Sequence, residues 1–136
     1  EIDAIEALLD AGQIVIAAGG GGIPVMEQGT TLKGASAVIE KDYTAAKLAD
    51  MVDASHLMIL TSKEQMETAD GQAIGKISVS DAISLIDENH FDAITTLPKV
   101  DASVSFVSSG EGRTAIITKL ENAYQGIKER IGTIIK

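Results

Sequence analysis

An unbroken apolar run that ends in four glycines constrains this 136-residue chain more than any other feature. Residues 14–18 read Ile-Val-Ile-Ala-Ala, and residues 19–22 are all glycine. A run of Val, Ile and Ala without polar alternation is typical of a parallel strand that is buried on both faces. We therefore predict a buried strand, with the glycines at its carboxyl end, where open α/β sheets bind their ligands.

The glycine loop predicts an anion-binding site. Glycine accepts positive φ and lets consecutive backbone N–H groups face one phosphate or carboxylate. The loop lacks the Lys-Ser/Thr that follows a phosphate-binding loop and the spacing of the dinucleotide fingerprint. At this point a flexible junction between a strand and a loop is an equal alternative.

The composition limits the partners of this chain. Twenty acidic residues against eleven Lys and Arg give a formal net charge of -9, which repels nucleic acids and anionic membranes. We expect neither as a partner. The 45% hydrophobic content suffices for one core, so we expect a single domain over residues 1–136. The absence of cysteine fits a cytoplasmic protein, and the helical pattern that begins at Glu1 without a methionine suggests a piece of a larger protein.

Helical and strand patterns alternate along the chain, which predicts an α/β fold with a mainly parallel sheet. The expected helices cover residues 1–10 with an end at Ala11-Gly12, 43–52 with Asp42 as N-cap, 82–86, and a stretch from Pro98 to Gly110. The expected strands, besides the first, cover residues 37–39, 56–61, 114–118 and 132–135, and a hairpin or a surface excursion is expected within 26–34. Thr118 and Glu121 match a capping box.

Two lysines are placed where a helix disfavours a cation. Lys41 precedes the helix at 43–52, and Lys99 follows Pro98 in the first turn of another. The helix dipole opposes a positive charge there by about 0.3–1 kcal/mol, so a shared anionic ligand would explain both. The two histidines, His56 and His90, are far apart in sequence and are expected to be structural or solvated rather than metal ligands.

Five segments in the same order resemble the carboxyl-terminal half of carbamate kinase, in the amino-acid kinase family. They are AAGGGGIPV (17–25), LKGASAVIEKD (32–42), LMILT (57–61), LPKV (97–100) and AIITKLEN (115–122). The resemblance implies a three-layer α/β/α sandwich of which this chain is the nucleotide-binding part. It also implies a missing amino-terminal half, a homodimer, and ATP or ADP with Mg²⁺. The implied reaction is reversible phosphoryl transfer between ATP and carbamate, commonly toward ATP from carbamoyl phosphate in arginine fermentation.

The resemblance also implies roles for single residues. Lys41 would contact the oxygens of the transferring phosphate, Asp42 would orient the lysines, and Lys99 would bind the β and γ phosphates. Gly20 and Gly21 would offer N–H groups to the transferred phosphoryl group. Thr61, Ser62, Thr95 and Thr96 would line the nucleotide site. No metal ligand is assigned, and the isolated chain is not expected to turn over.

Two departures from the family pattern leave an alternative open. Ile94-Thr95-Thr96 stands where the family usually has Gly-Ser-Met, and residues 62–66 replace a turn that usually contains a Tyr. A β-branched residue does not easily take the positive φ open to glycine. The alternative is a catalytically degenerate carbamate kinase-like protein kept for binding or assembly. A different amino-acid kinase with another acceptor is a further possibility.

Overall fold

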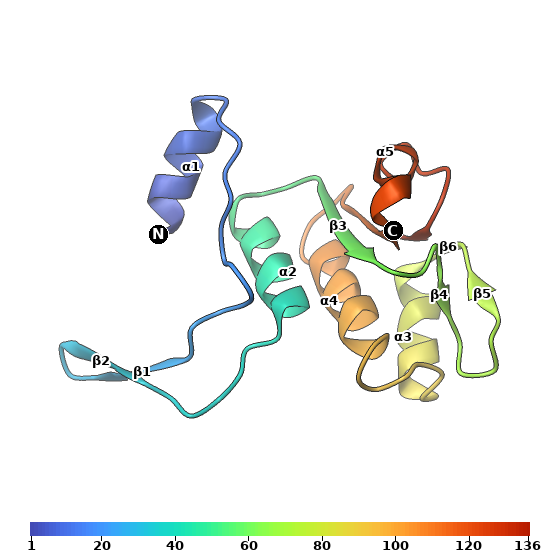
Figure 1. The fold of residues 1–136 in the computed structure, drawn as a ribbon, viewed down its shortest axis with the longest axis horizontal. Coiled ribbons are helices and arrows are strands. Elements are labelled where there is room, and N and C mark those ends of the chain that lie inside the picture. The colour runs from blue at the N-terminus through green and yellow to red at the C-terminus, as the bar shows by residue number, and fades with distance from the viewer.

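The computed structural model describes all 136 residues and is centred on a four-stranded sheet. The strand order is β3-β7-β8-β6 (Figure 1). β3 (His56–Thr61) pairs in parallel with β7 (Thr114–Lys119), which pairs antiparallel with β8 (Thr133–Ile135); β8 pairs in parallel with β6 (Lys76–Ile77). The predicted mainly parallel sheet is confirmed, and β3 is left as an edge strand.

Helices cover both faces of the sheet, which confirms the α/β/α layering. α2 (Lys41–Met51), α3 (Val79–Asp87) and α4 (Leu97–Ser108) form the thicker layer, with α4 in contact with β3, β7 and β8. The short α5 (Ala123–Gly126) follows a 3₁₀ turn, Leu120–Asn122, and packs against β7 from the other side.

The side chains of β7 alternate between the two layers, as a strand requires. Ala115 and Ile117 belong to one buried cluster with Val100 and Phe106 of α4. Gly126 of α5 lies against the other face, where a Cβ on it would come within 3.2 Å of Ile116. Burial of this kind contributes about 25 cal/mol per Å² of apolar surface removed from water.

Two hairpins and a helix lie outside the sheet. β1 (Val25–Gln28) and β2 (Thr31–Gly34) form the predicted antiparallel hairpin, whose residues are all exposed. β4 (Met66–Glu67) and β5 (Ala73–Ile74) form a second hairpin beside the sheet. α1 (Ile2–Asp10) buries no residue, and Figure 1 shows it with the first hairpin on the side of α2 away from α4. None of the helices is both long and apolar enough to cross a membrane.

The prediction of a buried strand at residues 14–18 is wrong for this structure. The run has no strand partner, and its only backbone hydrogen bond goes from Gly21 N–H to the carbonyl of Ala18. Ile14 and Ile16 are 97% and 98% exposed, whereas Val15 and Ala17 are half-buried. The side chains thus alternate as in a strand, but a ladder needs a second chain to accept and donate its hydrogen bonds.

Three local predictions also need correction. Residues 37–39 form no strand, and Val38 is 94% exposed. α2 begins at Lys41 rather than 43, and its N-cap is Glu40 rather than Asp42, because the Glu40 carboxylate accepts from the Asp42 N–H. The capping box is absent, since the Thr118 hydroxyl donates instead to the Glu64 carbonyl at 3.1 Å.

A buried arginine joins the end of α2 to the start of β7. The Arg113 guanidinium donates to Asp50 at 2.8 Å and to Asp53 at 3.0 Å, and it lies 5.1 Å from the ring centroid of Phe106. Hydrogen bonds, first from Arg113 and then from Lys47, hold the pKa of the Asp50 carboxyl well below its usual range. The cluster fixes the helix that carries Lys41 and Asp42.

Replacing this arginine should destabilise the protein. We expect Arg113→Met to lower the melting temperature by several degrees, because it removes the hydrogen bonds from the buried guanidinium to Asp50 and Asp53 and its contact with the Phe106 ring. Arg130→Met is the matched control, since Arg130 is exposed and makes no ion pair. Because the folded-state pKa of Asp50 is depressed, the stabilisation is present above the ordinary carboxyl pKa and is lost as the pH falls through the depressed value. Thermal melts at neutral and strongly acidic pH test this; equal melting temperatures of the two variants at neutral pH would contradict it.

Candidate functional site

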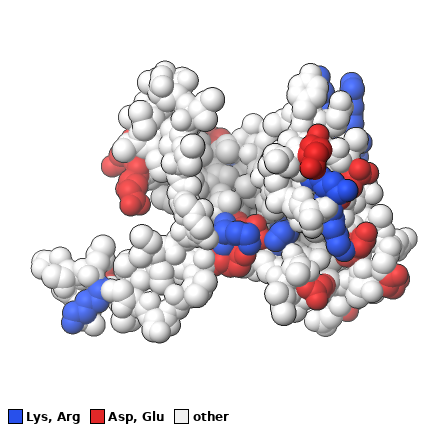
Figure 2. Space-filling view, viewed as in Figure 1, with Lys and Arg blue, Asp and Glu red and all other residues white.

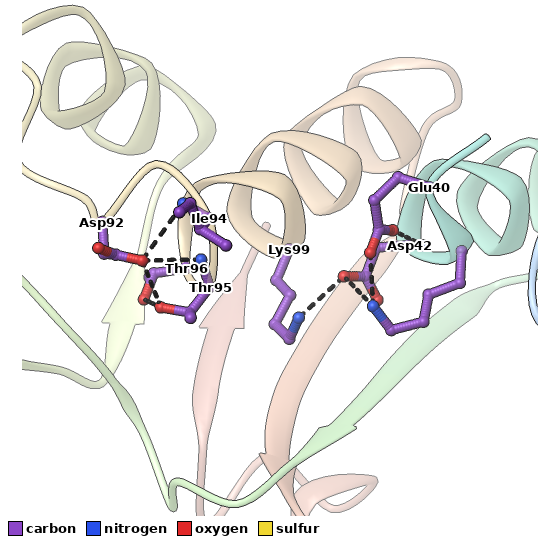
Figure 3. A network of polar contacts seen from close by, with 8 residues as sticks. Glu40, Asp42, Asp92, Ile94, Thr95, Thr96 and Lys99 are labelled. Atoms are coloured by element: carbon purple, nitrogen blue, oxygen red, sulfur yellow. Dashed lines mark hydrogen bonds and ion pairs between the residues drawn. The ribbon is translucent and has the colours of Figure 1, made fainter. Parts of the chain in front are cut away.

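Lys41, Asp42 and Lys99 meet at one buried carboxylate. Lys99 Nζ lies 2.9 Å from Asp42 Oδ2, and Lys41 Nζ lies 3.7 Å from the same oxygen. Both distances end on one atom, so the two ammonium nitrogens are at most about 6.6 Å apart. Figure 3 shows Lys99 reaching from α4 toward Asp42 on α2. One polyphosphate could therefore contact both lysines.

The topology explains why these residues meet. Short connections lead from the end of α2 to β3 and from the end of α4 to β7, so each helix runs back along its strand. The first turns of both helices therefore lie at the carboxyl edge of the parallel pair, where the exposed N–H groups of a helix favour anions. A second link between the helices, from Tyr43 Oη to Asp101 at 2.7 Å, holds them in register. Loss of hydration, with help from Asp101, raises the pKa of Tyr43 to about 12.

Burial divides the two lysines into different environments. The Lys99 side chain is only 14% exposed, and Asp42 is 7% exposed. The Lys41 side chain is 57% exposed and is held by Glu40 Oε1 at 2.5 Å. The hydrogen bond from Lys41 lowers the pKa of Glu40, and the same bond raises the pKa of Lys41. Lys99 is thus the largely buried lysine of the cluster, and Lys41 is the exposed one.

The glycine loop lies directly against the start of α2. Ala18 and Gly19 both have positive φ, of 64° and 51°, and turn the chain sharply before Gly20. Gly21 has a φ of 146°, and a Cβ on it would come 2.4 Å from the carbonyl oxygen of Ile39. Only glycine permits this approach. The loop is therefore placed beside the residues that lead into Glu40 and Lys41.

A groove connects the loop with the charged cluster. Its volume is about 500 Å³, and its lining is mostly apolar. Its lining includes Val15 and Ala17 of the apolar run, Gly21 of the loop, Met58 and Leu60 of β3, and residues of α2 that include Lys41 and Asp42. Figure 2 shows this hollow between the α1 side and the body of the molecule, with basic and acidic side chains gathered at its lower end.

The two threonines before α4 are less available than the sequence suggests. Thr96 is the N-cap of α4 and is only 6% exposed. The Thr95 hydroxyl and N–H donate to Asp92 at 2.6 and 2.8 Å, and the Ile94 N–H donates to the same oxygen at 3.2 Å. Figure 3 shows these bonds one turn before Lys99. Asp92 thus accepts from both N–H groups, and these are not free for another acceptor.

Thr61 and Ser62 lie at the carboxyl end of β3, as predicted, but the structure does not join them to the cluster. Thr61 is half-buried and is in register with Lys119 of β7, and Ser62 is exposed. No hydrogen bond or ion pair connects either side chain to a lysine of the cluster. They lie at the same edge of the sheet as the first turn of α4, which carries Lys99. Their contact with a nucleotide stays a prediction.

Sequence reasoning missed Glu40, Thr44 and Asp92. Glu40 was missed because the preferred N-caps are Ser, Thr, Asp and Asn, and Asp42 offered one of these two residues later. Thr44 and Asp92 carried no signal, since their hydrogen bonds depend on where the glycine loop and the turn before α4 come to lie. The histidines have local partners only: Ser55 lies 2.9 Å from His56, and Glu88 lies 3.0 Å from His90. No group of three or more His, Cys, Asp or Glu side chains is placed to hold a metal ion by itself.

Comparison with known proteins gives consistent matches. A family model described as the amino acid kinase family matches residues 1–119. The carbamate kinase-like protein YqeA of Escherichia coli is 48% identical over 139 residues, which cover 99% of this chain and 45% of that protein. Carbamate kinase of Clostridium perfringens is 42% identical, with 99% and 44% covered. A solved structure of carbamate kinase from Giardia lamblia bound to AMP-PNP superposes with a TM-score of 0.93 at 32% identity, covering 99% of this chain and 48% of that one. The chain thus spans less than half the length of these relatives.

Proposed function

The chain belongs to the amino acid kinase family, and from that premise we propose that it is the carboxyl-terminal, nucleotide-binding part of a carbamate kinase. The reaction would be reversible phosphoryl transfer, in which carbamoyl phosphate and ADP give carbamate and ATP. The observation that carries the proposal is the convergence of Lys41 and Lys99 on the Asp42 carboxylate beside the glycine loop.

The charges of this cluster suit phosphoryl transfer, which is catalysed mainly by positioning and by stabilising charge on the phosphate oxygens. Lys99, fixed by Asp42, would bind the β and γ phosphates. Lys41 would exchange Glu40 for an oxygen of the transferring group, because its side chain is 57% exposed. N–H groups of Gly20 and Gly21 would bind the same phosphoryl group. No nucleophilic side chain is needed.

Magnesium fits this arrangement as a companion of the nucleotide. Mg²⁺ in such sites usually keeps several waters and binds one or two carboxylates together with substrate phosphates. The two carboxylates of the site, Asp42 and Glu40, already pair with the lysines, so the ion would be held mainly by phosphate oxygens and water. The ion would neutralise charge on the phosphate oxygens, while the two lysines bind and orient the nucleotide.

We propose that the remaining half of a protein of the relatives' length completes the sheet and supplies the carbamoyl phosphate side. Three observations support this. β3 has an open edge, and Ile14 and Ile16 are exposed. An apolar groove is lined both by β3 and by residues of the 14–18 run. Exposed apolar surface of this kind is typical of an interface. The homodimer that the resemblance implies belongs to the same proposal.

The direct test is ATP formation by the full-length protein from carbamoyl phosphate, ADP and Mg²⁺. We expect ATP to form at a rate proportional to enzyme concentration, and ATP with carbamate to run the reverse reaction. Circular dichroism and a cooperative thermal melt would establish that the sample is folded. A folded protein that makes no ATP under these conditions would overturn the proposed activity.

A second function, binding without catalysis, is favoured by one specific observation. Asp92 already holds the N–H groups of Ile94 and Thr95, which precede Lys99 by one turn. Because these N–H groups already donate to Asp92, they would be less available to a nucleotide, and the site would bind nucleotide less well. Calorimetry with ADP and Mg²⁺ on the full-length protein separates the cases: tight binding that is lost in Lys99→Ala supports the kinase, and absence of binding supports the degenerate protein.

A further inference from the structure

The glycine loop and the lysine cluster belong to two parts of the chain that are joined by a single hydrogen bond. Among all backbone and side-chain hydrogen bonds and ion pairs, only Gly22 N–H to Thr44 Oγ1, at 2.9 Å, connects residues 1–39 with residues 40–136. Thr44 lies in the first turns of α2, three residues after Lys41 and two after Asp42. The bond therefore ties the loop to the helix that carries two of the three charged groups.

The Thr44 hydroxyl is oriented for this task. It donates its proton to the Glu40 carbonyl at 3.2 Å, within its own helix. Because that bond uses the only hydrogen, the oxygen presents a lone pair to the Gly22 N–H. Thr44 is half-buried, so water competes less for the bond than it would at the surface. A valine at this position would keep the shape of the side chain and lose both bonds.

We propose that Thr44 is a positioning residue that holds the glycine loop over the first turn of α2. This inference rests on the proposed function, in which Gly20 and Gly21 bind the transferred phosphoryl group. Thr44 would not touch the substrate. It sets the distance between the loop N–H groups and Lys41, and this distance matters most when charge develops on the phosphoryl oxygens.

The test compares Thr44→Val, Thr44→Ser and wild type in the full-length protein. We expect Thr44→Val to lower kcat by about 3- to 10-fold, the range of one hydrogen bond, with the KM for ADP nearly unchanged because Lys99 remains. Thr44→Ser keeps the hydroxyl and should restore kcat to within about twofold. Thr31→Val is the matched control, because the Thr31 hydroxyl bonds to Gln28 in the distant hairpin.

A second measurement does not depend on activity. Hydrogen exchange of the Gly22 amide should be faster in Thr44→Val than in wild type and Thr44→Ser, whatever reaction the protein catalyses. Unchanged exchange in Thr44→Val would overturn the proposal, and so would an equal loss of kcat in Thr44→Ser and Thr44→Val. If wild type makes no ATP, the proposed activity fails, while the exchange experiment still decides whether Thr44 holds the loop.

Discussion

Lys99→Met in the full-length protein is expected to weaken ADP binding by about 100-fold and to lower kcat/KM by about 100- to 1000-fold. Lys99 is the buried cation of the cluster, with a side chain 14% exposed and an ammonium group 2.9 Å from Asp42. Methionine keeps an unbranched apolar stem that is one atom shorter, and it removes the ammonium group. Calorimetry with ADP and Mg²⁺ measures the first effect and initial rates the second.

Two further variants make this result interpretable. Lys33→Met removes an exposed lysine of the first hairpin that has no ion-pair partner, so it should bind ADP like wild type. Lys99→Met leaves the Asp42 carboxylate buried with only Lys41 nearby, which destabilises the fold. Adding Asp42→Asn should recover the melting temperature without recovering ADP affinity. Wild-type affinity in folded Lys99→Met would contradict the assignment of Lys99 to the phosphates.

Gly21→Ala is expected to lower kcat by about 100-fold, because displacing a positioning element by about 1 Å costs that much. The added methyl group would lie 2.4 Å from the Ile39 carbonyl oxygen, and the φ of 146° is strained for any residue with a side chain. The loop must therefore move away from α2. Initial rates with carbamoyl phosphate and ADP measure the effect.

Gly34→Ala is the control for this variant, since a Cβ there meets no atom within 4 Å and its φ is not positive. It should retain the wild-type rate. Gly20 also has room for a methyl group, with no atom within 4 Å, so any loss in Gly20→Ala would report on contact with the ligand rather than on packing. Equal rates for Gly21→Ala and Gly34→Ala would show that the loop does not need its position against Ile39.

The convergence of Lys41, Asp42 and Lys99 could be predicted from sequence because each helix leads by a short loop into a parallel strand. Local patterns place the starts of α2 and α4 to within two residues, and the handedness and direction of such units place both starts at one edge. The chemical roles of the three residues remain predictions. What chemistry they perform depends on a ligand, not on the fold alone.

The strand at residues 14–18 could not be predicted correctly from the run itself. Apolar content reports that a segment can be buried, but it does not report whether a partner is available to cover Ile14 and Ile16. The cap at Glu40 and the turn at Asp92 were missed for a related reason. Several polar residues stand near each helix start, and only the path of the backbone decides which carboxylate reaches the N–H groups.

The open edge of β3 has a consequence for handling this chain outside a longer protein. The unpaired N–H and C=O groups of an edge strand can form hydrogen bonds with a strand of another molecule. The exposed side chains of Ile14 and Ile16 add apolar surface that favours the same association. Concentrated preparations of the chain alone should therefore form dimers and larger aggregates through this edge. Lysine substitutions at Ile14 and Ile16 would be a rational first step toward a monodisperse sample.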